Sequence, residues 1–254
     1  MDDIRNYDPS NSSVLGRLLE ELSWVGKTIK NYREGGRGYE NVLTAEVFQS
    51  LDFLPRKQFF GEIIKNSHGA DATRKILFDE IENIDFCLLP GNHYLIPSGT
   101  RHQTKLPVQP DGLIESENIY GVIEAKRIRS SSFQSEQLAR EYVLALRDSN
   151  DKKPLLFLIL GDKPPVKVTK HGKISIKDSI EIYIESVLER TERHSISKEV
   201  AMAQVDDVVC WITWEEIYNI TKSQKDLFSI EDNSTRASIT RLANSIIKSI
   251  EWHK

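Results

Sequence analysis

The stretch that decides the fold is VQPDGLIESENIYGVIEAKR, residues 108–127. Two apolar runs flank a polar centre, and this pattern predicts a β-hairpin with a two-residue turn at 117–118. In that register Asp111 lies directly opposite Glu124 on the neighbouring strand. Like charges in this position destabilise a strand pair. The hairpin is therefore expected to hold something cationic between the two carboxylates.

Lys126 completes a polar group on one face of this hairpin. Successive strand side chains point to opposite faces, so Lys126 shares the face of Glu124, whereas Ile123 and Ala125 point the other way. Two carboxylates on adjacent strands suit Mg²⁺, which binds oxygen ligands and substrate phosphate. A lysine beside them supplies positive charge for a phosphoryl-transfer transition state. The pattern predicts a metal-dependent phosphodiesterase site; the alternative is a solvent-facing hairpin with a cross-strand ion pair.

The segments around the hairpin predict an α/β fold. Strands are predicted within 85–97, in the hairpin and at 153–162, and a second hairpin at 166–176. Apolar residues at helical spacing predict helices at 14–31, 39–54, 56–66, 71–84, 131–149, 177–194 and 234–252, and residues 206–220 predict a strand running into a helix. The order is helices, three strands, helix, strand, helix, strand. This order indicates a mixed central sheet flanked by helices.

Composition is typical of a soluble globular protein, with 39% hydrophobic and 28% charged residues. The net charge of −4 excludes a generally basic nucleic-acid coat. The longest apolar run, at 155–161, is too short to span a bilayer, and no signal-peptide core is present. Two cysteines indicate a reducing compartment, so we expect a cytoplasmic protein without membrane contact. No glycine-rich nucleotide-binding motif occurs, and no organic cofactor is expected.

Pro110-Asp111 and Glu124-Ala125-Lys126 resemble the signature of the PD-(D/E)XK nuclease superfamily. The likeness covers residues 38–160 and implies a restriction-endonuclease-like αβββαβ core. It implies an N-terminal helical extension at 1–37 and a nuclease domain at 38–254 with a C-terminal hairpin and helices. It also implies that Asp111, Glu124 and the Ala125 carbonyl bind Mg²⁺, for which Mn²⁺ substitutes. Lys126 would orient water and stabilise the transition state.

The resemblance implies a further carboxylate from a helix. Gly36-Arg37-Gly38-Tyr39-Glu40 resembles the opening of modification-dependent restriction enzymes and nominates Glu40. Glu80, directly before the first strand, and Glu46 are the other candidates. A carboxylate in the first turn of a helix is also favoured by the helix dipole alone. Glu40 is therefore a candidate for catalysis with two rivals.

The resemblance also implies a glutamine on the helix after the lysine strand. SEQLAREY offers Gln137, with Gln134 one turn earlier. The Gln-x-x-x-Tyr spacing of some family members is missed by one residue, because Tyr142 is five positions after Gln137. An exposed helix residue is the alternative interpretation of Gln137.

By resemblance, the expected partner is DNA and the expected activity is endonucleolytic cleavage, in restriction, other defence or repair. Arg127 and Arg129 follow the catalytic strand, and Lys170 and Lys173 lie in a lysine-rich segment; all four are candidate phosphate contacts. A solvated surface is the alternative for the lysines. A homodimer is expected, since many family endonucleases cut duplexes as dimers. Two alternatives stay open: a non-catalytic binding module with this fold, and an unrelated α/β protein.

Overall fold

The computed structural model describes residues 39–96, 105–129, 131–191 and 196–254. The helix predicted at 14–31 and the predicted extension at 1–37 lie outside the described residues.

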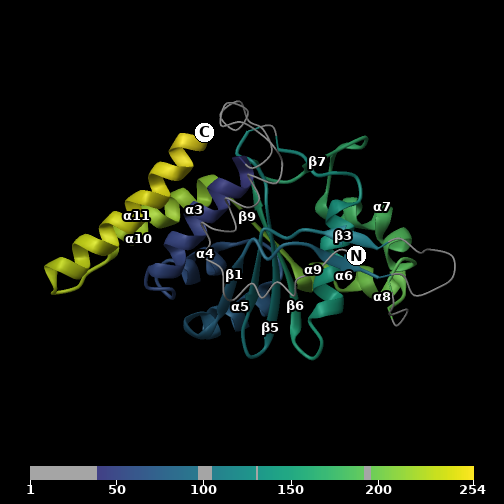
Figure 1. Ribbon diagram of the computed structural model, residues 1–254, viewed down its shortest axis with the longest axis horizontal. Coiled ribbons are helices and arrows are strands. Elements are labelled where there is room, and N and C mark those ends of the chain that lie inside the picture. Colours follow the sequence, from purple (N-terminus) through teal and green to yellow (C-terminus); the bar gives the residue numbers. More distant parts are fainter. Residues whose placement is uncertain (1–38, 97–104, 130, 192–195) are drawn as a thin grey trace, which may run out of the picture.

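A mixed five-stranded sheet forms the centre of the fold, in the order β1-β4-β5-β6-β9 (Figure 1). β1, β4 and β5 are antiparallel, whereas β5, β6 and β9 are parallel. The strands are β1 (Asp85–Leu88), β4 (Gly112–Glu115), β5 (Ile119–Ala125), β6 (Lys153–Leu160) and β9 (Val209–Thr213). The predicted mixed sheet is confirmed.

The β4–β5 hairpin has the predicted register. Gly112 is paired with Ile123, and the Ser116 amide donates to the Ile119 carbonyl (3.0 Å) to close the turn. Beyond the end of β4, the Asp111 amide donates to the Ile123 carbonyl (3.0 Å). Asp111 and Glu124 therefore lie at the open end of the hairpin, away from its turn.

Helices cover both faces of the sheet (Figure 1). They are α3 (Tyr39–Phe53), α4 (Phe60–Asn66), α5 (Asp71–Glu80), a 3-10 turn (Ile81–Asn83), α6 (Gln137–Asp148), α7 (Ile176–Leu188), α8 (Lys198–Ala203), α9 (Val205–Val208), α10 (Trp214–Leu227) and α11 (Asn233–His253). One core cluster joins the sheet to α3, α4, α5, α10 and α11. A second joins its other face to α6, α7, α8 and α9. Two separate apolar layers thus hold the sheet.

Alternation along β5 assigns its side chains to these layers. Ile123 and Ala125 are fully buried in the layer of α3 and α11, and Val122 is fully buried in the layer of α6. Glu124 shares the alternation of Val122, so its carboxylate is on the α6 face. The same periodicity that builds the core therefore delivers a charged side chain to the start of α6.

Two small sheets complete the described fold. β2 (His93–Leu95) pairs with β3 (Leu106–Val108), and β7 (Val166–Val168) pairs with β8 (Gly172–Ile174), which confirms the second predicted hairpin. The strand predicted within 206–220 begins only at Val209, because α9 forms a single helical turn before it. Among the described helices, none combines the length and apolar character needed to cross a bilayer.

Candidate active site

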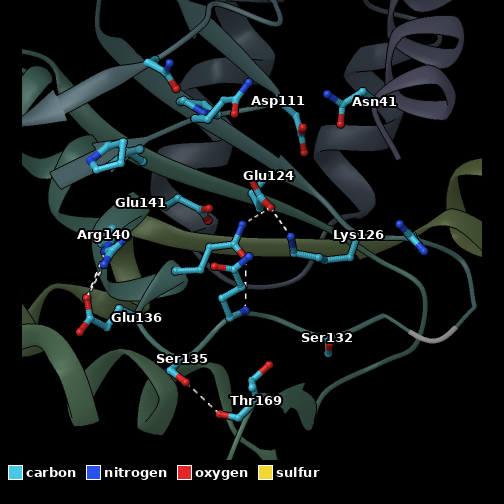
Figure 2. A pocket seen from close by; sticks show the side chains of 18 of the residues that line it. Asn41, Asp111, Glu124, Lys126, Ser132, Ser135, Glu136, Arg140, Glu141 and Thr169 are labelled. Atoms are coloured by element: carbon cyan, nitrogen blue, oxygen red, sulfur yellow. Dashed lines mark hydrogen bonds and ion pairs between the residues drawn. The ribbon is translucent and has the colours of Figure 1, made fainter. Parts of the chain in front are cut away.

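A cavity of about 1020 Å³ opens at the end of β5 (Figure 2). Asp111 immediately precedes β4, and Lys126 immediately follows β5, so the open end of the hairpin forms its floor. The loop before α6 and the first turns of α6 form a wall. The polar lining includes Asn41, Asn92, Gln109, Asp111, Glu124, Lys126, Arg127, Gln134, Gln137, Arg140, Glu141 and Thr169.

The three predicted catalytic side chains lie together and are buried. The exposed fractions are 8% for Asp111, 3% for Glu124 and 7% for Lys126. The Lys126 ammonium forms an ion pair with Glu124 Oε1. Charged side chains are rarely buried to this degree unless they are paired or bind a ligand. The alternative of a solvent-facing hairpin is therefore wrong.

Backbone hydrogen bonds fix the peptides that carry the site. The Ala125 amide donates to Asp111 Oδ2 (2.7 Å), which holds that carboxylate against the end of β5. The Lys126 amide donates to the Ile159 carbonyl (2.7 Å), and the Lys126 carbonyl accepts from Trp214 Nε1 (2.6 Å). Rigid strands and a buried tryptophan thus position the charged groups, as a preorganised site requires.

Gln137 joins the site from the first residue of α6. Its Nε2 donates to Glu124 Oε1 (2.5 Å), and its Oε1 accepts from the Gln134 amide (3.3 Å). Glu124 Oε1 therefore accepts from both an ammonium and an amide, which orients the carboxylate. The alternative of an exposed helix residue is wrong for Gln137.

Removal of the Gln137 amide should loosen Glu124 without unfolding the protein. We expect Gln137→Ala to lower metal affinity and cleavage rate by about 10–100-fold, the usual cost of losing the partner that orients a ligand. Metal titration and single-turnover cleavage measure these effects. Gln49→Ala is the matched control, because Gln49 is exposed on α3 and does not line the cavity. Equal metal affinities for both variants and the wild type would contradict this role.

Glu141 is a carboxyl group of the site that the sequence did not indicate. It lies one helical turn after Gln137, is 2% exposed and lines the cavity. Its Oε2 has no hydrogen-bond partner among the described residues. Burial raises the pKa of Glu141 well above its usual range, and the adjacent Glu124 carboxylate raises it further. Burial and the neighbouring Glu124 thus both favour the protonated form of Glu141.

Glu141 is four residues after Gln137, the position of the tyrosine in the Gln-x-x-x-Tyr spacing of the nuclease superfamily that the sequence resembles. Tyr142, one residue later, points instead into the core, where it is fully buried and its hydroxyl donates to the Ala201 carbonyl (2.5 Å). The one-residue offset therefore places a carboxyl group, not a phenol, beside Gln137.

The buried Glu141 predicts a pH dependence of stability in the metal-free protein. Its pKa is higher in the folded than in the unfolded state, so the folded protein keeps a proton that the unfolded chain releases. The contribution of Glu141 to the free energy of unfolding is therefore complete below its pKa in the unfolded chain. It falls as pH rises toward its pKa in the folded protein, by at most about 1.4 kcal/mol per pH unit. Glu141→Gln should remove this decline.

Urea unfolding at pH 5 and pH 8 in EDTA measures the effect. The difference in unfolding free energy between the two pH values should be smaller in Glu141→Gln than in the wild type. Glu181→Gln makes the same change on the exposed surface of α7 and serves as the control. Parallel stability profiles for wild type and Glu141→Gln would contradict the assignment.

Of the two candidates on α3 for the helix carboxylate of the site, Glu46 lies away from the cavity. The Glu40 side chain lies outside the described residues, although its neighbour Asn41 lines the cavity. Glu46 is exposed on α3 and lies near His253 of α11. It does not line the cavity. The prediction of Glu46 as the helix carboxylate of the site is therefore wrong.

Glu80 is also wrong as the helix carboxylate, because it lies at the opposite end of the hairpin. Its carboxylate accepts from the side chains of Ser116 and Asn118 at the β4–β5 turn. Partial burial opposes ionisation of Glu80, but these hydrogen bonds outweigh it and hold its pKa below the usual value. Glu80 therefore stabilises the turn.

The four predicted phosphate contacts have different positions. Arg127 lines the cavity, whereas Arg129 is exposed outside it. Lys170 and Lys173 are exposed on the β7–β8 hairpin, whose Thr169 lines the cavity. The structure therefore brings one arginine into the site and leaves the lysines at its margin.

The donor chemistry of the site fits a hard divalent cation. Asp111 and Glu124 offer carboxylate oxygens, the ligands that Mg²⁺ prefers. The described residues contain no cluster of three or more acidic, histidine or cysteine side chains arranged to hold a metal. Mg²⁺ commonly binds through one or two carboxylates and takes its other ligands from water and substrate phosphate. A two-carboxylate site of this kind matches that pattern.

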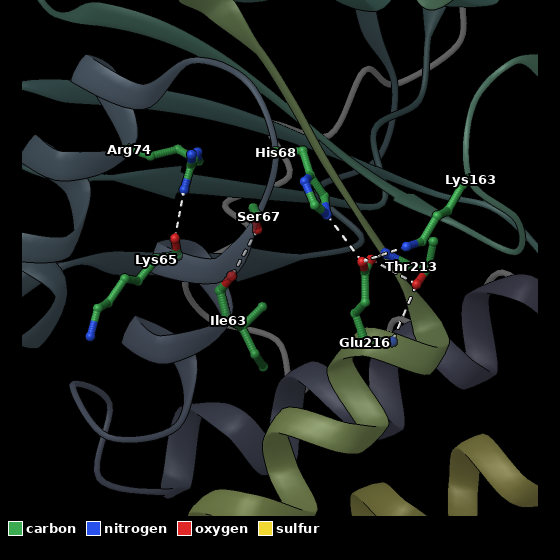
Figure 3. A network of polar contacts seen from close by, with 8 residues as sticks. All are labelled: Ile63, Lys65, Ser67, His68, Arg74, Lys163, Thr213 and Glu216. Atoms are coloured by element: carbon green, nitrogen blue, oxygen red, sulfur yellow. Dashed lines mark hydrogen bonds and ion pairs between the residues drawn. The ribbon is translucent and has the colours of Figure 1, made fainter.

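A second polar network lies where β9 leads into α10 (Figure 3). Glu216 and Thr213 form a capping box, and Glu216 also contacts His68 Nε2 (3.0 Å) and Lys163 Nζ (3.6 Å). The His68 ring stacks on Trp211 with centroids 4.2 Å apart. Burial opposes ionisation of Glu216, but the hydrogen bonds outweigh it and lower its pKa. The Thr213 contacts of this carboxylate cap the start of α10, and its His68 and Lys163 contacts link that helix end to two loops, which is a structural role.

No family model matches the chain, and neither curated proteins nor solved structures give a match.

Proposed function

We propose that this protein is a metal-dependent DNA endonuclease of the PD-(D/E)XK type. The observation that carries the proposal is the burial of Asp111, Glu124 and Lys126 together on the floor of one cavity. The element order of the central sheet supports it: β1, β4 and β5 are antiparallel, with the β2–β3 pair inserted after β1, and α6 and the parallel strand β6 follow, as in a restriction-endonuclease-like core. Gln137 on α6 bonded to Glu124 is a further agreement with the resemblance.

Each residue has a distinct role in this proposal. Asp111, Glu124 and the Ala125 carbonyl would hold Mg²⁺ or Mn²⁺, which when bound polarises the phosphoryl group and lowers the pKa of water. Lys126 places positive charge where negative charge develops on the phosphate, and it orients the attacking water. Gln137 keeps Glu124 in its orientation. Arg127, at the cavity wall, is suited to hold a neighbouring phosphate.

Preorganisation accounts for the burial of these groups. In a site of low effective dielectric, fixed charges interact more strongly with a developing charge than they do in water. Two buried carboxylates facing one ammonium are costly to the fold, and a substrate-bound divalent cation offsets that cost. By resemblance, we propose a role in defence against foreign DNA or in repair, with a homodimer cutting duplexes.

A cleavage assay on short end-labelled duplexes tests this proposal. Purified protein should shorten the duplex with Mg²⁺ or Mn²⁺ and leave it intact with EDTA. Gel sizing of the labelled products separates internal cuts from stepwise shortening, and gel filtration with light scattering gives the oligomeric state. Metal binding in calorimetry without cleavage of any duplex would instead favour the non-catalytic binding module.

A further inference from the structure

The β7–β8 hairpin carries three lysines at the margin of the cavity. The antiparallel register of this hairpin sets Lys167 directly opposite Lys173, and Lys170 lies in the turn between the strands. All three are exposed. Like charges that face each other across a strand pair are destabilising. The stability of the fold therefore does not explain this arrangement. Lys167, Lys170 and Lys173 are called the hairpin lysines below.

The fold neutralises the lysines on either side of the hairpin but not these three. Lys163, before β7, pairs with Glu216 (3.6 Å), and Lys177, after β8, pairs with Asp206 (2.7 Å). No carboxylate of the described residues forms an ion pair with a hairpin lysine. Their charge is thus left for an anion from outside the chain.

The hairpin is fixed to the wall of the cavity through Phe133. The Phe133 amide donates to the Lys167 carbonyl, and the Thr169 amide donates to the Phe133 carbonyl, both at 2.9 Å. The Phe133 ring is buried, with Lys126 Nζ 5.0 Å from its centroid. One residue thus touches both the hairpin and the central lysine of the site, which sets the distance between them.

The charged face of the hairpin continues the cavity wall. Val166 and Val168 are buried in the α6 layer, so the intervening Lys167 points to the other side of β7. By the same alternation Lys167 shares its side with Thr169. Thr169 lines the cavity and accepts a hydrogen bond from the Ser135 hydroxyl (3.1 Å; Figure 2). The hairpin lysines therefore extend one side of the site outward.

We propose that the hairpin lysines bind the phosphate backbone of the nucleic acid whose scissile phosphate enters the cavity. This inference rests on the proposed function, because it takes DNA as the ligand. Contacts of this kind position a substrate without reading its sequence. They also bring a polyanion to a chain of net charge −4, for which long-range attraction is otherwise unfavourable.

The salt dependence of DNA binding tests the proposal. Binding of one oligonucleotide, as duplex and as single strand, is followed by fluorescence anisotropy in EDTA, which separates binding from cleavage. Changing all three hairpin lysines to Gln should make the slope of log K against log salt shallower by about 0.9 per lost contact on duplex and about 0.7 on single strand. The charge-preserving change of all three to Arg should restore the slope. The matched control changes three exposed lysines elsewhere to Gln: Lys57, Lys222 and Lys248.

Each outcome separates the hairpin from the nuclease. A shallower slope only in the hairpin Gln variant supports the proposal, and the strand form with the larger change identifies the preferred substrate. An unchanged slope in a folded variant overturns the proposal even if the wild type cuts DNA. If the slope is shallower only in the hairpin Gln variant but the wild type never cuts DNA, the hairpin contact stands and the proposed nuclease activity is overturned. Absence of DNA binding by the wild type at any salt concentration overturns both.

Discussion

Lys126→Ala is expected to lower the rate of metal-dependent DNA cleavage by about 10²–10³-fold, the usual effect of removing one preorganised charge or donor from a transition state. Lys126 is 7% exposed and its ammonium contacts Glu124, so its charge is largely removed from bulk water on the cavity floor. Water in the truncated variant is a poor substitute, because it must reorganise as charge develops. Single-turnover cleavage of a labelled duplex with Mg²⁺ measures the change.

Stability must be measured beside this rate. Loss of Lys126 leaves Glu124 buried without its cation, which typically costs about 3–5 kcal/mol. The double variant Lys126→Ala/Glu124→Gln removes both charges, and it should be folded but inactive. Lys163→Ala removes a lysine from an exposed pair with Glu216 and should cut at the wild-type rate. Full activity in a folded Lys126→Ala protein would contradict the role given to this lysine.

Asp111→Asn should nearly abolish binding of the divalent cation. Asparagine keeps the size of the side chain, and its oxygen can still accept from the Ala125 amide, so the fold is preserved. It removes the negative charge and a strong metal-ligand oxygen. The affinity for Mg²⁺ or Mn²⁺ should fall by more than the about 10–100-fold that loss of an outer partner costs. Calorimetric titration of metal into the protein measures this.

Asp79→Asn provides the control for this substitution. Asp79 lies on α5 in an exposed pair with Lys75, far in sequence from the site, and its loss should leave metal affinity unchanged. If Asp111→Asn and wild type bound metal equally, the metal would belong elsewhere and the pairing of Asp111 with Glu124 would need another explanation.

The hairpin and its register could be predicted because they depend on local rules. A polar two-residue turn between alternating strands fixes which residues face each other, and this rule alone places Asp111 opposite Glu124. Gln137 could be proposed from its spacing after the lysine strand by resemblance. The four-residue helix α9 and strand β3, with its pairing to β2, were missed, because short elements show no periodicity and depend on distant partners.

The helix carboxylates show where sequence reasoning fails. Glu80 lies on an apolar stripe directly before β1, but the direction of α5 sends it to the turn end of the hairpin, where it binds Ser116 and Asn118. Glu141 precedes Tyr142 on α6; Tyr142 is buried with its hydroxyl bonded to the Ala201 carbonyl, whereas Glu141 lies beside Glu124. Local pattern gives the face of a helix, whereas tertiary packing decides which end of the sheet it meets.

Nicking of covalently closed plasmid tests the central claim most directly, because a closed circle offers no ends and only an endonuclease relaxes it. Wild type and Asp111→Asn are purified in parallel and compared with Mg²⁺ and with EDTA. We predict open circles only from the wild type with Mg²⁺. Equal nicking by both proteins, or nicking that persists in EDTA, would contradict a metal-dependent site at Asp111, Glu124 and Lys126.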